Sequence, residues 1–168
     1  MRLAGITRFL ASPAEREAIA REFQLAASGL VLGPACRSRL EDLTSASGCY
    51  LWTMDVDEDR FKIYIGQTRS LRKRVTDYSI EMQIHSPNDF KLRFFQELAL
   101  EVFPSARFDV HFAPLPDGER HEREKSLVRQ FAPLINTLRV PTQADRAIIL
   151  NGYRQYYRAA FAHRCGDA

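Results

Sequence analysis

The chain has no apolar run approaching the roughly 20 residues that a membrane-spanning helix needs. Its N-terminal apolar residues are interrupted by Arg8 and soon followed by acidic residues, so we expect no signal peptide. Cysteine is scarce, and Cys36, Cys49 and Cys165 form neither a CxxC pair nor a cysteine–histidine spacing typical of zinc. These absences argue against a membrane-spanning protein and a cysteine-based zinc site. They predict a protein of a reducing, cytoplasmic setting.

Several common catalytic patterns are missing as well. The sequence has no glycine-rich phosphate loop, and neither Ser70 nor Ser126 lies in a nucleophile elbow. No helix-paired or triad-like spacing is found among the histidines, which are His85, His111, His121 and His163. The net charge is only +3, and no repeat or low-complexity segment occurs. Nucleotide-binding loops, serine nucleophiles and histidine metal sites are therefore not indicated.

What the chain does contain is enough apolar residues for a core and a local concentration of positive charge. Its 168 residues, 45% of them hydrophobic, suit one domain. The segment 60–74 gathers six cations, which are Arg60, Lys62, Arg69, Arg72, Lys73 and Arg74. The tail 152–164 is also basic. Local patches of this kind bind phosphate without an extreme overall charge.

Hydrophobic periodicity and breaker residues predict a mixture of helices and strands. Two strands, 49–56 and 60–67, are separated by a polar turn and read as an antiparallel hairpin, and 106–115 alternates like a third strand. Helices are expected over 13–27, 35–43, 70–82, 90–103, 118–133 and 141–164. The order of these elements predicts an α+β domain with a small sheet.

The hairpin brings two tyrosines together if its turn centres near Glu58. Tyr50 then pairs with Gly66, and Trp52 with Tyr64, which puts Tyr50 and Tyr64 on one face of the sheet. By the same alternation, Lys62 is expected on the face of Tyr64. Each tyrosine has an alternative interpretation as an ordinary core residue with a satisfied hydroxyl.

Glu124 and Arg74 both lie in line with apolar helix stripes. Glu124 shares a face with Leu127, Val128 and Phe131, so its carboxylate points inward and needs a cation. A salt bridge, for instance to Arg74, and a metal ion explain Glu124 equally well at this point. Arg74 in turn suits a structural ion pair or a bidentate phosphate contact.

Five elements, in order, resemble the GIY-YIG nuclease family. The residues GCY at 48–50 stand at its first motif, and YIG at 64–66 is its second motif letter for letter. The segment 69–75 resembles the basic helix whose arginine falls on Arg74, and Tyr78 lies where family members carry tyrosine or histidine.

The last of these elements is EKSLVRQFAPLIN at 124–136, which resembles the family's E-x-x-L-I…P-x-x-N segment. It is close to the version in the nuclease domain of the excision nuclease subunit of nucleotide-excision repair. The resemblance covers about residues 47–137. It implies a three-stranded antiparallel sheet flanked by helices. Outside the resemblance, we expect an N-terminal helical extension over 1–46 and a C-terminal helix over 138–168 that packs on the domain.

The resemblance implies a metal-dependent endonuclease that hydrolyses DNA phosphodiester bonds and leaves a 5′-phosphate. Glu124 would bind one Mg²⁺ or Mn²⁺ ion, and Arg74 would hold the scissile phosphate. Tyr64 or Tyr50 would position a water and take its proton. Tyr78 completes the tyrosine set, and Asn136 would orient groups beside Glu124. DNA contacts are expected from Lys62, Arg69, Arg72 and Lys73.

Two residues depart from the family pattern. Cys49 replaces an aliphatic residue, and Gln67 stands where some relatives carry lysine. Glutamine cannot supply the positive charge that would lower the pKa of a tyrosine, so Lys62 is the candidate substitute for that charge. The identity of the general base stays open.

Other interpretations stay open at this point. The chain could be a non-catalytic nucleic-acid-binding module, or an effector, on the same fold, and its substrate could be RNA. Because one such site cuts one strand, a double-strand break would need a homodimer or two successive binding and cleavage events. In the final helix, the aromatic and arginine residues suit nucleic acid, and the stripe of Tyr153, Tyr157 and Ala160 equally suits packing on the core or on a second subunit.

Overall fold

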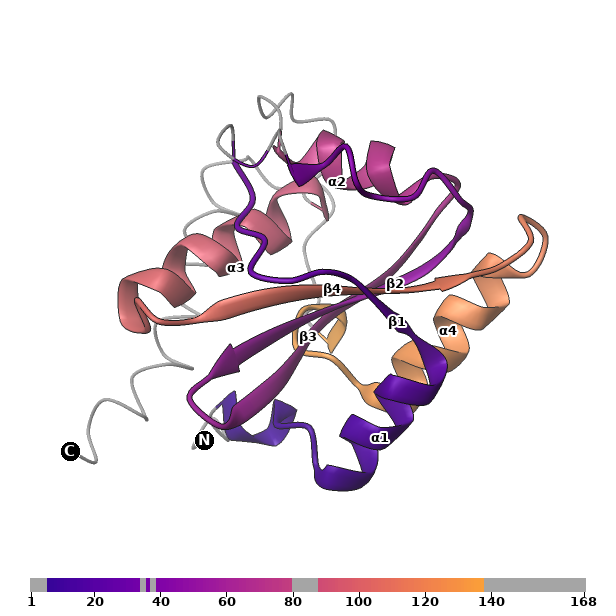
Figure 1. The fold of residues 1–168 in the computed structure, drawn as a ribbon. Coiled ribbons are helices and arrows are strands. Elements are labelled where there is room, and N and C mark those ends of the chain that lie inside the picture. Colours follow the sequence, from indigo (N-terminus) through magenta and orange to yellow (C-terminus); the bar gives the residue numbers. More distant parts are fainter. Residues whose placement is uncertain (1–5, 34–35, 37–38, 80–87, 138–168) are drawn as a thin grey trace, which may run out of the picture.

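The computed structural model describes residues 6–33, 36, 39–79 and 88–137 and has an α+β fold (Figure 1). Its sheet is antiparallel and consists of β1 (Gln24–Ala27), β2 (Gly48–Val56), β3 (Asp59–Thr68) and β4 (Arg107–Pro114), in the order β1-β4-β2-β3. The helices are α1 (Pro13–Glu22), α2 (Leu71–Ser79), α3 (Asn88–Val102) and α4 (Arg120–Phe131), with short 3-10 turns at η1 (Ile6–Phe9) and η3 (Ile135–Thr137). Helices α2 and α3 lie on one side of the sheet, and α1 and α4 on the other.

The sheet has four strands where the sequence predicts three, because the segment predicted as helix 13–27 changes conformation in its middle. Ser12 and Glu15 form a capping box that starts α1. The helix ends at Phe23, whose backbone is extended and whose side chain is buried. Residues 24–27 then pair with β4, and this pairing overrides their helix propensity. The segment 1–46, predicted as a helical extension, therefore contributes a strand as well as α1.

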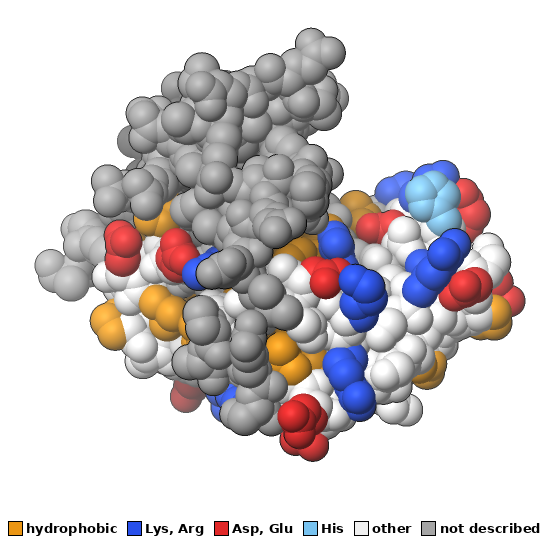
Figure 2. Space-filling model, turned by 90° about the horizontal axis from the view of Figure 1, so that it is seen from above, with side chains coloured by type: hydrophobic (Ala, Val, Ile, Leu, Met, Phe, Trp, Pro, Cys, Tyr) orange, Lys and Arg blue, Asp and Glu red, His pale blue; other side chains and the backbone are white. Residues whose placement is uncertain are grey.

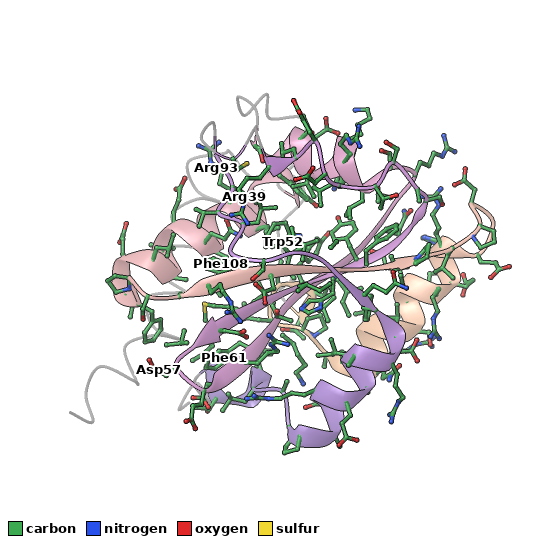
Figure 3. All side chains as sticks on the ribbon, in the orientation of Figure 1. Arg39, Trp52, Asp57, Phe61, Arg93 and Phe108 are labelled. Atoms are coloured by element: carbon green, nitrogen blue, oxygen red, sulfur yellow. The ribbon has the colours of Figure 1, made fainter. Side chains whose placement is uncertain are left out.

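The predicted hairpin register is confirmed. Tyr50 lies opposite Gly66 and Trp52 opposite Tyr64. Asp57, at the tip of the hairpin (Figure 3), has a φ of 54°, a left-handed conformation that aspartate tolerates better than most residues. Near the turn Val56 pairs with Asp59 and Thr53 with Lys62, and the register then shifts by one residue, so the irregularity as well as the turn places the two motif tyrosines on one face of the sheet.

An irregularity in the β2–β3 ladder contradicts the prediction for Lys62. The register shifts between Trp52 and Thr53, so that Lys62 lies opposite Thr53. One extra residue in a strand reverses the face of every residue beyond it. Lys62 is only 4% exposed and forms an ion pair with Glu15 of α1. The expectation that Lys62 shares a face with Tyr64 and supplies its charge is therefore wrong.

Alternate residues of β2 enter two separate apolar layers. Toward α2 and α3, Tyr50, Trp52 and Met54 pack in one cluster, in which the ring centroids of Phe95 and Phe108 lie 6.4 Å apart, edge to face. Trp52 and Phe108 of this cluster are labelled in Figure 3. Toward α1 and α4, the second cluster contains Cys49, Leu51, Ile65, Ile19, Leu127 and Phe131. Burying each large side chain of this kind contributes about 2 kcal/mol. The two layers hold β2 and β3, and therefore their tyrosines, between helices on both sides.

The outer edge of β3 is covered by the chain itself. The Ala11 amide donates to the Arg60 carbonyl at 2.8 Å, and the Leu134 amide donates to the Lys62 carbonyl at 3.0 Å. Further along, the Asn136 side chain pairs with both backbone groups of Ile65. An edge blocked in this way is protected from pairing with another chain.

The helix expected over 35–43 is not found as an α-helix among the described residues of that range, of which 40–43 form bends and turns. The remaining elements match the prediction to within a few residues where the structure describes them. Helices α2, α3 and α4 and strand β4 fall inside the ranges expected for them, except that α3 starts at Asn88. The end of the helix expected at 70–82 and the C-terminal helix over 138–168, with its tyrosine stripe, lie outside the described residues. None of the helices in the described part combines the length and apolarity needed to cross a membrane.

His111 of β4 predicts how stability depends on pH. It is 6% exposed, and its Nε2 lies 3.1 Å from the Thr53 hydroxyl. Burial, reinforced by Arg60, lowers the His111 pKa from 6.5 to about 4, although Asp109 and Asp55 oppose the shift. The unfolded chain therefore takes up this proton first, and stability falls as pH drops from 6.5 to about 4, by up to about 3 kcal/mol.

Urea unfolding across this pH range checks the prediction, with His111→Gln as the variant that lacks the titrating group. We expect the stability difference between the wild type and His111→Gln to shrink steadily as the solution is acidified. A difference that does not change with pH would show that His111 does not carry this dependence.

Candidate active site

Three tyrosine side chains, from β2, β3 and the end of α2, lie together. The Tyr50 and Tyr78 hydroxyls lie 2.8 Å apart in a hydrogen bond. The Tyr50 and Tyr64 rings meet edge to face with centroids 6.0 Å apart. Tyr50 and Tyr78 are 1% and 3% exposed, whereas Tyr64 is only partly buried. Of the three tyrosines, Tyr64 is therefore the most exposed.

Gly66 makes room for the Tyr50 phenol. A Cβ atom at residue 66 would lie 2.4 Å from the Tyr50 hydroxyl oxygen and 2.5 Å from its Cζ. The Tyr50 side chain thus crosses directly over the backbone of the facing strand to reach Tyr78. This contact is the physical reason for a glycine at the end of the YIG segment.

Substitution of Gly66 by alanine is expected to displace the Tyr50 ring and break its hydrogen bond to Tyr78. Overpacking of a buried site costs about 1–3 kcal/mol, so the variant should unfold at lower urea concentration. We also expect the Tyr50 and Tyr78 ring signals to shift in NMR spectra. A Gly33→Ala variant is the control, because a Cβ at Gly33 meets no atom within 4 Å and its φ of 155° strains alanine without touching the tyrosines. Unchanged tyrosine signals in Gly66→Ala would contradict the packing argument.

Arg74 contacts two of these tyrosines. Its Nε donates to the Tyr50 hydroxyl at 3.4 Å, and its guanidinium carbon lies 4.6 Å from the centre of the Tyr78 ring. Burial acts to lower the Arg74 pKa, but the hydroxyls of Tyr50 and Tyr78 outweigh it and the pKa is raised. Arg74 is thus held as a cation by the phenols that surround it.

The same burial acts against ionisation of the phenols. Desolvation raises the pKa of Tyr64, with Tyr50 and Glu124 acting in the same direction and Arg74 opposing them. The pKa of Tyr78 is raised for the same leading reason. Both phenols are therefore protonated near neutral pH in the free protein.

Glu124 is a partly buried carboxylate on α4. It lies on the helix face that carries the buried residues Leu127 and Phe131. Within the described part of the chain, its oxygens accept no hydrogen bond and form no ion pair. Burial raises the Glu124 pKa, and His121, Arg74 and Arg120 act to lower it. The expected alternative of a direct salt bridge to Arg74 is not what the structure has.

The Glu124 carboxylate and the Arg74 guanidinium interact through their charges, although their helices, α4 and α2, lie on opposite sides of the sheet. Glu124 changes the pKa of Tyr64, and Arg74 changes the pKa of Glu124. Helix α4 packs against β3, the strand that carries Tyr64. Tyr50, Tyr64, Tyr78 and Arg74 thus form a group of interacting side chains, and the Glu124 charge acts on Tyr64 from the α4 side.

Asn136 has a different position from the one the resemblance implies. The Ile65 amide donates to its Oδ1 at 2.8 Å, and its Nδ2 donates to the Ile65 carbonyl at 2.8 Å. The Asn136 amide therefore acts like an added strand residue beside the YIG segment. It fixes the backbone between Tyr64 and Gly66 and does not orient Glu124 directly.

The four residues expected to contact DNA divide into two groups. Lys62 is buried and paired with Glu15, as described above. Arg69 and Lys73 have side chains that are 82% and 76% exposed. Arg72 is exposed as well, although its Nε donates to the Leu43 carbonyl at 2.8 Å. Figure 2 looks onto this side of the molecule and shows Lys and Arg side chains gathered on its described surface, with acidic residues among them.

Arg120 is a site residue that sequence reasoning missed. Its Nη1 donates to the Gln67 side chain, and its own side chain is 12% exposed. It stands one helical turn before Glu124, and this spacing was the only signal for it. The Cys49 thiol lies 3.5 Å from the Arg120 carbonyl oxygen. Burial raises the pKa of this thiol to about 11. Cys49 thus acts as a small apolar residue.

The residues present fit a hard divalent cation with few protein ligands. No group of three or more His, Cys, Asp or Glu residues gathers within the described residues. Mg²⁺ commonly takes one or two carboxylates and completes its shell with water and substrate phosphate. Glu124, with no partner for its oxygens in the described chain, supplies such a carboxylate.

Comparison of the chain with protein-family models, with curated proteins and with solved structures found no match. A functional proposal therefore depends on the geometry of the site and on the motifs described above.

Proposed function

We propose that the chain is a metal-dependent endonuclease of the GIY-YIG type that hydrolyses phosphodiester bonds in DNA. The observation that carries the proposal is the Glu124 carboxylate, which is partly buried and without a partner among the described residues, while its charge interacts with Arg74 and Tyr64. A partly buried carboxylate without a partner lowers the stability of the folded state unless a cation binds to it. Structural acids in this protein, such as Asp55, are by contrast fully paired with arginines.

Arg74 suits the scissile phosphate. A guanidinium presents a planar set of donors that matches two phosphate oxygens, and its charge offsets the negative charge that grows in the transition state. The Tyr50 and Tyr78 contacts hold it in place before substrate arrives. Little reorganisation is then needed when the phosphate binds.

Tyr64 is the phenol assigned to the attacking water, because Tyr50 and Tyr78 are buried and already bonded to each other. In the free protein Tyr64 is protonated, since burial raises its pKa. It orients the water through its hydroxyl. For Tyr64 to take the water's proton its pKa would have to fall, and a divalent cation held by Glu124 would supply the positive charge that lowers it.

Glu124 would hold the single Mg²⁺ or Mn²⁺ ion of the reaction. When bound, such an ion stabilises the leaving oxygen of the ester as a Lewis acid. Asn136 keeps the backbone on which Tyr64 stands at the correct position.

Nicking of supercoiled plasmid DNA in Mg²⁺ tests the proposal, with wild type, Glu124→Ala and Arg74→Ala compared side by side. We expect nicking by the wild type alone, and its loss when the metal is chelated. Equal activity in all three proteins would refute the assignment. Salt-dependent DNA binding without cleavage in Mg²⁺ or Mn²⁺ would indicate a non-catalytic binding module instead.

A further inference from the structure

Two arginines, Arg69 and Arg120, form ion pairs with the same exposed aspartate, Asp117, beside the candidate active site. Arg69 lies in the turn between β3 and α2, and Arg120 is the first residue of α4. The Arg69 Nε lies 3.7 Å from one oxygen of Asp117, and the Arg120 Nε lies 3.4 Å from the other. Asp117 belongs to the connection between β4 and α4, three residues before Arg120, so two segments far apart in the sequence meet at this cluster.

The two arginines are held differently. Arg120 is 12% exposed and is fixed on three sides, since it donates to the Gln67 side chain, donates to the Asp117 backbone carbonyl at 3.3 Å and pairs with the Asp117 carboxylate. Arg69 is 82% exposed, and the ion pair with Asp117 is the contact that its side chain makes within the described residues. One cation of the pair is therefore preorganised, and the other is free to adapt.

The Asp117 carboxylate is easily replaced in this arrangement. Its side chain is 60% exposed, and neither ion pair has the short geometry of the paired acids in the sheet, such as Asp55 and Arg60 at 2.7 Å. Exposed pairs of this kind contribute little to stability. A backbone phosphate offers the same two charged oxygens to two guanidiniums and binds arginine more strongly than a lone carboxylate in water does.

The cluster lies next to the residues assigned to the chemistry. Arg69 stands five residues before Arg74, across the start of α2, and Arg120 stands one helical turn before Glu124. Gln67, which holds Arg120, follows directly after the glycine that supports Tyr50. A DNA strand whose scissile phosphate rests on Arg74 therefore passes this cluster.

We propose that Arg69 and Arg120 form a second phosphate subsite, which binds a DNA backbone phosphate neighbouring the scissile one, and that Asp117 occupies this subsite in the free protein. The inference rests on the proposed function for its choice of DNA as ligand. In this proposal Asp117 competes with the DNA phosphate, so removal of the Asp117 charge is expected to improve DNA binding.

Binding of a fluorescein-labelled DNA duplex, followed by anisotropy in EDTA at several salt concentrations, tests the subsite. We expect Asp117→Asn to tighten binding about threefold, and Arg120→Gln to weaken it about tenfold, as for loss of one charge-assisted hydrogen-bonded contact. The slope of log K against log[salt] should fall by about 0.9 in Arg120→Gln, the value for one lost phosphate contact. Arg120→Lys should retain the slope, because it retains the charge.

Glu97→Gln is the matched control, since Glu97 is also an exposed carboxylate in an ion pair with an arginine, Arg93 of α3, which is not among the residues expected to contact DNA. Binding that is equal in Asp117→Asn and Glu97→Gln, together with an unchanged slope in Arg120→Gln, would overturn the subsite. Plasmid nicking in Mg²⁺ separates this result from the proposed function. If Glu124→Ala cleaves like wild type while the binding changes occur as expected, the chemistry is wrong and the subsite stands.

Discussion

Replacement of Glu124 by glutamine is expected to abolish DNA cleavage while leaving DNA binding in place. Glutamine has the shape of glutamate but lacks the charge that holds a divalent cation. Loss of a metal ion that supplies several kcal/mol of transition-state stabilisation slows a reaction on the order of a thousandfold. The initial rate of plasmid nicking in Mg²⁺ measures the effect, and anisotropy with labelled duplex measures binding.

Stability distinguishes this role of Glu124 from a structural one. Its carboxylate is partly buried, its pKa is raised by that burial, and the described residues provide it with no partner. The neutral amide should therefore leave the unfolding midpoint unchanged or raise it, as is common where a site sacrifices stability for function. Glu122→Gln is the control, because Glu122 lies on the same helix but is exposed and paired with Lys125. Nicking by Glu124→Gln at the rate of Glu122→Gln would show that Glu124 does not bind a catalytic ion.

Replacement of Arg74 by lysine is expected to slow cleavage about a hundredfold, although the charge is conserved. Lysine cannot make the paired contact with two phosphate oxygens, and a transition-state donor of this kind is worth about a hundredfold or more. Lysine also loses the stacking of the guanidinium over the Tyr78 ring, which lies 4.6 Å away. The expected loss is in kcat, because the ammonium still attracts DNA to the site.

Arg72→Lys is the matched comparison for Arg74→Lys. Arg72 belongs to the same turn of α2 but is exposed, and its Nε donates to the Leu43 carbonyl. We expect nearly wild-type rates for this variant in the same nicking assay. A similar modest loss in both variants would mean that Arg74 acts only through general charge on this surface.

The hairpin and its tyrosines were predictable because local signals agreed there. A short polar turn between two strand-forming runs indicated the hairpin, and the expected pairing of Tyr50 with Gly66 is found, although the structure reaches it through the register shift between Trp52 and Thr53. The contact of Arg74 with this face followed from its position on the helix that begins after β3. In these elements the periodicity, the turn chemistry and the final packing all point to the same structure.

The failures occurred where long-range contacts decide the outcome. Residues 24–27 form a strand because they pair with β4, and no local pattern in the sequence predicts that pairing. The register shift that turns Lys62 toward Glu15 depends on how β2 and β3 fit between two layers of helices. The contact between Arg120 and Gln67 joins segments that are far apart in sequence, so spacing alone could not reveal it.

The account depends on one claim, that the Glu124 carboxylate, the Arg74 guanidinium and the tyrosine phenols serve a single metal-binding site. Paramagnetic broadening of ¹³C-tyrosine NMR signals by Mn²⁺ tests it without any assay of activity. We predict that substoichiometric Mn²⁺ broadens the ring signals of Tyr50, Tyr64 and Tyr78 and that Glu124→Gln abolishes this broadening. Sharp tyrosine signals in the presence of Mn²⁺, or broadening that persists in Glu124→Gln, would contradict the claim.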